Sequence, residues 1–268
     1  MNKKILLVSI ALITLTLMAY GFNCMFGSKK DQAVAVNSNS VPADEQIEQQ
    51  VIHPALPAFS YVVGTRFNSI SKTDLQNAKS FSDFIAKEHA DRIVSYASLS
   101  VITLKDGNQT DSNKTTNSGV FSAAQLALLQ SFDYSANILI SAKYTEKSFE
   151  TGELQQSIWT PYLTVVPEKQ AVYTTGKEAL LDYLKENSKE QRVMVQKNRL
   201  KPARLNFTIT KNGAVSNAKI VRTSGYSTID SKMIELINNM PDSWEAAENA
   251  KGEKVDQELV FSFGADGC

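Results

Sequence analysis

The chain has 268 residues, 43% of them hydrophobic and 21% charged, so it is long enough for one large domain or two small ones with substantial cores. Basic and acidic residues number 28 each, and this balance gives no overall field that would attract nucleic acid. The two cysteines, Cys24 and Cys268, and the two histidines, His53 and His89, form no Cys/His cluster, which excludes a structural zinc site.

Residues 5–26 form an uncharged, mainly apolar segment directly after Lys3 and Lys4. As a helix, these 22 residues would extend about 33 Å, enough to cross a bilayer core of about 30 Å. We therefore expect a transmembrane anchor over residues 1–27. Two alternatives stay open, namely a signal peptide cleaved near Ala19-Tyr20-Gly21 and lipidation at Cys24. All three alternatives export the rest of the chain.

Residues 28–57 are polar and poor in aromatic residues, which is typical of a flexible linker. Residues 58–167 are then predicted to form an α+β middle domain, rich in β-structure and with a mostly antiparallel sheet, to which the sequence assigns no role. Its expected elements are a helix from Ser71 or Thr73 to about Lys87, a strand over 93–104, a polar loop over 108–118, a short helix capped by Ser122, and strands over 136–143 and 158–166.

Residues 168–268 are predicted to form a small antiparallel sheet packed by two helices. The helices are expected over 176–189 and from Ser227 or Thr228 to 240. Strands over 204–210 and 215–222 flank Asn212-Gly213, a dipeptide that accepts the positive φ angles of a tight hairpin. A last strand is expected over 253–263. Trp244 follows the helix-ending Pro241 and is expected to pack over the sheet.

Several short motifs of this last region occur in a recognisable order and spacing. They are Val165-Val166-Pro167-Glu168-Lys169, Glu178-Ala179-Leu180, Tyr183-Leu184, Phe207-Thr208-Ile209 with Asn212-Gly213, Ser224-Gly225, Ile229-Asp230, Met240-Pro241, Trp244, Ala247 and Gly252. Together they resemble the C-terminal domain of TonB as it occurs in Bacteroidetes-type energy transducers. The resemblance covers somewhat more than a third of the chain.

The resemblance implies a single-pass inner-membrane protein whose soluble part lies in the periplasm. Such a protein couples a proton-driven motor of the ExbB–ExbD type to a TonB-dependent outer-membrane receptor, for energy-dependent nutrient transport. Family members add a receptor peptide as a strand to a sheet edge, where backbone hydrogen bonds supply the affinity. Mapped onto this chain, the partner-binding edge is the last strand, with Gln257 and Glu258 pointing outward. The residues implied are Asp256, Gln257, Glu258, Leu259, Val260 and Phe261.

One alternative function stays open, that of an unpowered periplasmic adaptor with a TonB-like protein-binding domain. It is favoured by the anchor segment 5–26, which lacks the histidine that engages the motor, and by the short linker, which lacks a long proline-rich spacer. A homodimer is also left open. The sequence contains no nucleophile elbow, P-loop or dinucleotide fingerprint, so we expect no enzymatic activity, no cofactor and no metal.

Overall fold

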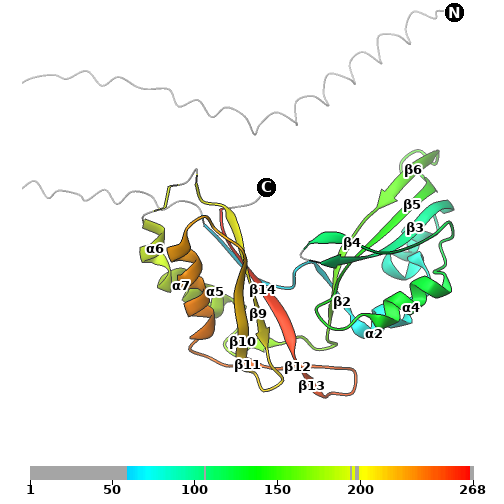
Figure 1. The fold of residues 1–268 in the computed structure, drawn as a ribbon. Coiled ribbons are helices and arrows are strands. Elements are labelled where there is room, and N and C mark those ends of the chain that lie inside the picture. Colours follow the sequence, from blue (N-terminus) through cyan, green and yellow to red (C-terminus); the bar gives the residue numbers. More distant parts are fainter. Residues whose placement is uncertain (1–58, 106, 194, 197–198, 266–268) are drawn as a thin grey trace, which may run out of the picture. The chain divides into compact units, whose positions relative to one another are not determined.

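Two larger sheets organise the computed structural model, which describes residues 59–265 apart from 106, 194, 197 and 198 (Figure 1). The described residues form an α+β protein, as predicted, and lie in one compact unit, Pro54–Cys268. The predicted anchor and linker lie outside the described residues. Among the residues that are described, no helix is both long and apolar enough to cross a membrane.

The first sheet, with the helices packed on it, is called the middle lobe. Its strand order is β2-β7-β5-β3-β4, and β6 also pairs with β5. All pairs are antiparallel except β2 with β7. The strands are β2 (Asn68–Ser71), β3 (Ile93–Lys105), β4 (Asn108–Thr116), β5 (Asn137–Lys147), β6 (Leu154–Trp159) and β7 (Tyr162–Val166).

Short helices surround the main core of the middle lobe. They are α2 (Lys72–Asn77), the 3-10 helix η1 (Phe81–Phe84), α3 (Lys87–Ala90) and α4 (Ala123–Ser131). Ser71 caps α2 by accepting a hydrogen bond from the Asp74 N–H, and Ser122 caps α4, as the sequence predicts. The core contains Leu75 from α2, Phe81 from η1 and Leu129 from α4, packed with residues of β3, β5 and β7.

The single helix predicted from about residue 71 to Lys87 is wrong, because two short helices, α2 and η1, replace it, and α3 begins only at Lys87. The chain leaves α2 at Ala78, which has extended backbone angles. The Phe121 N–H then donates to the Lys79 carbonyl at 2.9 Å, and the Phe81 N–H donates to the Gly119 carbonyl at 2.8 Å. These bridging hydrogen bonds need an extended backbone, and they place the Phe81 ring in the core, fully buried.

Two strand predictions in this lobe are also corrected. The polar stretch predicted as a loop over 108–118 contains strand β4, which pairs with β3 and lies at the sheet edge. Backbone pairing decides its conformation, since an edge strand can carry polar side chains on its solvent side. The strand predicted over 158–166 is two strands, β6 and β7, separated at Thr160-Pro161, where the proline lacks the N–H that a continuous ladder requires.

The second sheet has strand order β1-β14-β9-β10 and is antiparallel throughout; with its helices it is called the C-terminal lobe. Its strands are β1 (Ser60–Gly64), β9 (Pro202–Ile209), β10 (Val215–Arg222) and β14 (Gln257–Gly264). Two small ladders accompany it, β8 (Val172–Tyr173) with β11 (Trp244–Glu245), and β12 (Ala247–Glu248) with β13 (Lys254–Val255). The hairpin predicted at Asn212-Gly213 is confirmed, since β9 and β10 pair across it.

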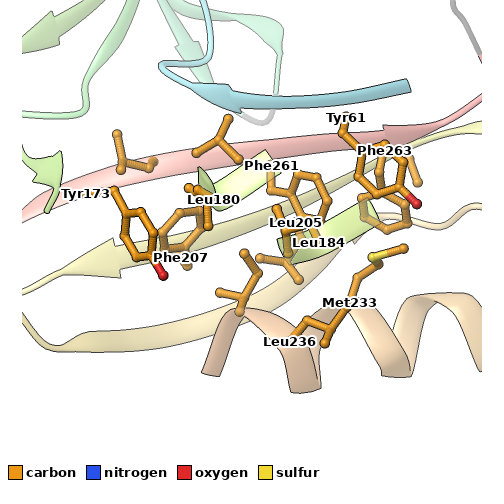
Figure 2. Close-up of a cluster of buried hydrophobic side chains, with 14 of the residues drawn as sticks. Tyr61, Tyr173, Leu180, Leu184, Leu205, Phe207, Met233, Leu236, Phe261 and Phe263 are labelled. Atoms are coloured by element: carbon orange, nitrogen blue, oxygen red, sulfur yellow. The ribbon is translucent and has the colours of Figure 1, made fainter. Parts of the chain in front are cut away.

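The core of the C-terminal lobe lies between one face of the sheet and the helices α5 (Lys177–Asn187) and α7 (Ser227–Asn238), with the short α6 (Lys189–Val193) between them in the chain. Alternate residues of β9, such as Leu205 and Phe207, are buried against these helices, and Figure 2 shows them among the aromatic rings of the cluster. Trp244 packs edge-on to Tyr173 and Phe207, which confirms its predicted core position.

Strand β1 belongs to the C-terminal sheet although it precedes the whole middle lobe in the chain. Residues 60–64 fall within the predicted middle domain, 58–167, yet they pair with β14 from Ser60↔Gly264 to Gly64↔Val260. The Tyr61 and Val63 side chains enter the helix-covered core, and the Tyr61 hydroxyl lies 2.6 Å from the Ser188 hydroxyl. The C-terminal sheet is therefore built from both ends of the described chain.

Candidate functional site

The last strand, β14, is not an edge strand. It pairs with β9 along one side and with β1 along the other, so the prediction that it presents a free hydrogen-bonding row is wrong. The physical reason is β1, whose five residues occupy the place that an added strand would take. A partner strand cannot pair with β14 unless it displaces β1.

The structure places the six predicted site residues in different surroundings. Asp256 is exposed and accepts a hydrogen bond from the Lys211 N–H at 2.7 Å. Gln257, predicted to point outward, is buried, and its side chain accepts from the Ala171 N–H at 2.7 Å. Glu258 is half-buried on the opposite face of the sheet. Leu259, Val260 and Phe261 are buried.

Among the described residues, no strand pairs with the outer side of β1 or of β10, so these are the two edges of this sheet. Strand β10 has features that discourage pairing, because its register with β9 is interrupted twice and it carries the exposed charges Lys219 and Arg222. Strand β1 has neither feature. Its register with β14 is uninterrupted, its sequence is Ser-Tyr-Val-Val-Gly, and Val62 at its centre is 55% exposed. The edge of β1 is thus the one that is open to strand addition.

An apolar cavity of about 240 Å³ lies at the end of this edge. Val63 and Gly64 of β1 line it, together with Leu180 of α5 and the Trp244 ring. The Trp244 Nε1 is buried and has no hydrogen-bond acceptor among the described residues. The cavity therefore suits an apolar group that also offers a carbonyl or hydroxyl oxygen.

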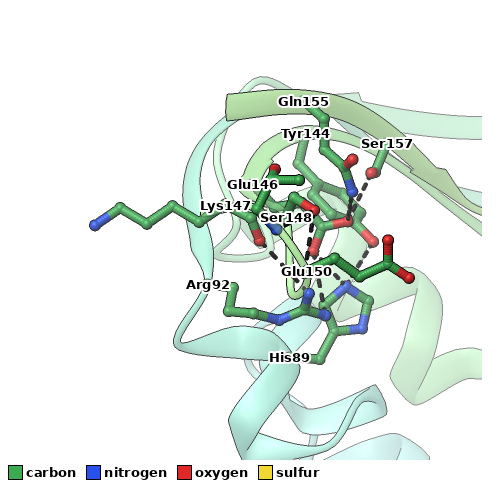
Figure 3. A network of polar contacts seen from close by, with 10 residues as sticks. His89, Arg92, Tyr144, Glu146, Lys147, Ser148, Glu150, Gln155 and Ser157 are labelled. Atoms are coloured by element: carbon green, nitrogen blue, oxygen red, sulfur yellow. Dashed lines mark hydrogen bonds and ion pairs between the residues drawn. The ribbon is translucent and has the colours of Figure 1, made fainter. Parts of the chain in front are cut away.

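A polar cluster, shown in Figure 3, is centred on the buried Glu146 near the turn of the β5–β6 hairpin. Glu146 of β5 is 5% exposed, and its Oε1 accepts a hydrogen bond from the Ser157 hydroxyl at 2.6 Å. Its Oε2 lies 3.2 Å from His89 Nε2 and 3.4 Å from Arg92 Nη2. The His89 Nε2 also lies 2.9 Å from the Tyr144 hydroxyl.

This cluster fastens the α3 segment to the sheet. The Glu146 Oε1 accepts hydrogen bonds, whereas the buried Oε2 has no hydrogen-bond donor among the described residues and is held by the ion pairs with His89 and Arg92 alone. Burial alone would raise the pKa of Glu146, but the hydrogen bonds from Ser157 and Gln155 and the charges of His89 and Arg92 outweigh it and hold the pKa below its ordinary value of 4.5. Neither Glu146 nor His89 lines the four cavities described at β2 and at the C-terminal sheet.

The lowered pKa predicts acid-sensitive stability. A carboxylate whose folded pKa is depressed stabilises the fold above its unfolded pKa, and this stabilisation is lost as the pH falls through the folded value. We expect wild type to exceed Glu146→Gln in unfolding free energy at pH 7, and the difference to shrink once the pH falls below about 4.5. Urea titrations at several pH values measure it, with exposed Glu153→Gln as the control. A difference that stays constant with pH contradicts the expectation.

The largest of these cavities, about 600 Å³, lies between β2 and the α2–η1 segment. Two acidic residues line it, Asp74 and Asp83. The Asp83 carboxylate is engaged at the start of its own helix, where it accepts from the Lys79 N–H at 2.7 Å and the Ser80 N–H at 2.9 Å. No group of three histidine, cysteine or acidic residues in the described part of the chain is placed to hold a metal ion. The feature of the described fold best suited to function is the free edge of β1.

No family model, curated protein or solved structure matches this chain. The site therefore rests on its own geometry. The sequence did contain a signal for the β1 edge, because Ser60–Gly64 is a short run with two valines and a tyrosine that ends in glycine. Its pairing partner lies about 200 residues further along the chain, and no periodicity reveals such a contact.

Proposed function

We propose that this chain is a membrane-anchored, TonB-like protein of the bacterial periplasm that pairs a sheet edge with an extended segment of an outer-membrane receptor. The observation that carries the proposal is the edge of β1, which is regular, uncharged and, in the part of the chain that the structure describes, paired on one side only. The nearby apolar cavity supports it, because a strand added to β1 would direct alternate side chains toward the helix-covered face. The predicted anchor would link the protein to an ExbB–ExbD-type motor.

The sequence also favours the unpowered adaptor, because residues 5–26 contain no histidine and the linker is short. In that function the same edge binds an envelope protein without transmitting force. The two functions share the binding site and differ in whether motor subunits are bound, so one experiment separates them.

The test is in-cell photocrosslinking of the full chain with a photoreactive amino acid at position 62, in the centre of β1. The matched position is 221 on the opposite edge, where Val221 is 39% exposed. We expect position 62 to crosslink to an outer-membrane receptor and position 221 to do so much less. The same membranes, crosslinked chemically, are analysed for motor subunits.

Each outcome decides between the proposals. Receptor and motor subunits recovered together support the energy transducer, whereas a receptor or another envelope protein recovered without motor subunits supports the adaptor. Crosslinks from position 221 alone would move the binding edge to β10. An absence of crosslinks from both positions, with protein levels unchanged, would contradict strand pairing.

A further inference from the structure

Three arginines converge on one small cavity at the face of the C-terminal sheet that is opposite its helices. Arg66 follows β1, Arg204 lies on β9 and Arg222 lies on β10. Arg204 alternates along β9 with residues of the helix-covered core, so its side chain stands on the other face of the sheet. The cavity measures about 200 Å³, and Ser262 of β14 also lines it.

The register of the strands places two of these positive charges side by side. Arg222 is the direct partner of Arg204, and Ser262 is the partner of Arg204 on its other side. Residues directly opposite each other in antiparallel strands share a face, and like charges in such positions destabilise a sheet. The pKa of Arg66 is lowered, first by partial burial and then by repulsion from Arg222. The third arginine therefore adds to the repulsion.

No described residue neutralises this cluster. The three guanidinium groups form no ion pair with another described residue and donate no hydrogen bond to one. The Arg66 guanidinium does lie over the Phe67 ring, 4.8 Å from its centre, which restrains the side chain without supplying an acceptor. Guanidinium groups gathered in this way are stabilised when an anion enters between them.

A phosphate group fits this cavity better than a carboxylate does. Guanidinium groups from three separate segments can each meet a different oxygen of a tetrahedral anion, whereas a carboxylate offers two oxygens and a single charge. A phosphomonoester carries a charge of about −1.5 to −2 near neutral pH. The cavity is smaller than the roughly 300 Å³ at which ordinary ligand pockets begin, so it holds one such group and little else.

A neighbouring cavity indicates what the phosphate is attached to. It measures about 350 Å³, shares Arg66 and Arg204 with the first, and is also lined by Asn206, Lys219 and Glu258. The Glu258 carboxylate accepts a hydrogen bond from the Asn206 Nδ2 at 3.0 Å. Amide, ammonium and carboxylate groups bind hydroxyl groups well, but an acyl chain would leave them without partners. The neighbouring cavity therefore suits a small polar group.

We propose that Arg66, Arg204 and Arg222 bind the phosphate of a small polar phosphomonoester, of the glycerol phosphate or sugar phosphate class. The hydroxyl-bearing part of this ligand occupies the neighbouring cavity, where Lys219 adds a fourth positive charge. The Ser262 hydroxyl donates to a remaining phosphate oxygen. Ligand binding at this site does not depend on strand pairing at β1, because the arginine pair lies on the two strands furthest from that edge.

Isothermal titration calorimetry of the full chain in detergent tests this proposal. The ligands are glycerol 3-phosphate, inorganic phosphate, glycerol and acetate, with dihexanoyl phosphatidic acid as a lipid that presents the same phosphomonoester. We expect glycerol 3-phosphate to bind about tenfold more tightly than inorganic phosphate, because it also occupies the second cavity, and glycerol and acetate not to bind in the same concentration range. The affinity should fall as sodium chloride is added, since added ions screen the charges.

Arginine variants locate the binding. Arg204→Gln and Arg222→Gln are each expected to weaken glycerol 3-phosphate binding about tenfold, because each removes a hydrogen bond between charged groups. Without ligand, Arg222→Gln should unfold at a temperature no lower than wild type does, since the substitution relieves repulsion. The charge-matched control is Lys211→Gln, because Lys211 is exposed and lines neither cavity. This control should bind every ligand as wild type does.

Four results would overturn the proposal. Glycerol 3-phosphate that does not bind would remove the site, and an affinity unchanged in both arginine variants would place it elsewhere. Inorganic phosphate that binds as tightly as glycerol 3-phosphate would leave an adventitious ion only. Dihexanoyl phosphatidic acid that binds more tightly than glycerol 3-phosphate, and loses this binding in the arginine variants, would make the ligand a lipid headgroup. Crosslinking from position 62 tests strand pairing separately, so the two proposals can fail independently.

Discussion

Replacing Phe261 with alanine is expected to lower the unfolding free energy of the C-terminal lobe by about 4 kcal/mol, within the range for a large aromatic residue removed from a core. The side chain is fully buried in β14, which has paired strands on both sides. Its ring lies 6.0 Å from that of Tyr61 and 5.1 Å from that of Phe263. Because Tyr61 belongs to β1, the cavity left behind would also weaken the attachment of that strand.

Urea unfolding followed by tryptophan fluorescence measures this effect. The two lobes each contain one tryptophan, Trp159 and Trp244, so a Trp159→Phe background makes the signal report the C-terminal lobe alone. The control is Val62→Ala, in which the replaced side chain is 55% exposed, and it should change stability by no more than about 0.5 kcal/mol. A loss below about 1 kcal/mol for Phe261→Ala would contradict the packing described for β14.

The second large effect is expected at the hairpin glycine. Gly213 has φ +78°, and a Cβ placed on it would lie 2.3 Å from the backbone oxygen of Trp244. Alanine at this position would meet both left-handed backbone strain and a clash with backbone that cannot rotate away. Strain of about 1–2 kcal/mol and overpacking of about 1–3 kcal/mol together predict a loss of about 3 kcal/mol.

The matched comparison for this glycine is Gly252. Its φ of +76° is almost the same, but a Cβ there meets nothing within 4 Å. Gly252→Ala therefore carries the backbone strain without the clash and should cost about 1 kcal/mol. Thermal and urea unfolding of the two variants measure the difference directly. Equal losses would show that the Trp244 backbone moves aside at no cost.

Local patterns predicted the elements that depend on neighbouring residues. The β9–β10 hairpin follows from strict alternation on both sides of Asn212-Gly213, and Ser122 is visible as a helix cap because its hydrogen-bond partner lies three residues away. The missed elements depend on distant contacts. Strand β4 looks like a polar loop until β3 pairs with it, and the segment after α2 is extended because it bridges to Val120.

The prediction of a partner-binding edge at β14 was wrong because it, too, depends on a contact between residues far apart in the sequence. Whether β14 is an edge strand can be decided only when every strand of the sheet is known. No local sequence pattern assigns β1 to this sheet, whose other strands begin more than a hundred residues later. A cavity of about 200 Å³ lined by Arg66, Arg204 and Arg222 was missed as well, because the three arginines come from separate segments of the chain. The sequence did predict the α+β class and the helix-covered core, since both follow from residue periodicity.

The pairing of β1 with β14 has a consequence for how the protein is made. Ser60 and Gly264, which are joined by a hydrogen bond, are 204 residues apart in the chain. During synthesis β1 is made about 200 residues before β14, so it has no strand to pair with until β14 has also been made. Until then the backbone hydrogen-bonding groups of β1, a segment without charged side chains, are exposed along both edges. Contacts between residues so distant in sequence also form slowly. A nascent chain of this protein is therefore expected to be most vulnerable to association with its neighbours at the segment that, once folded, forms the proposed binding edge.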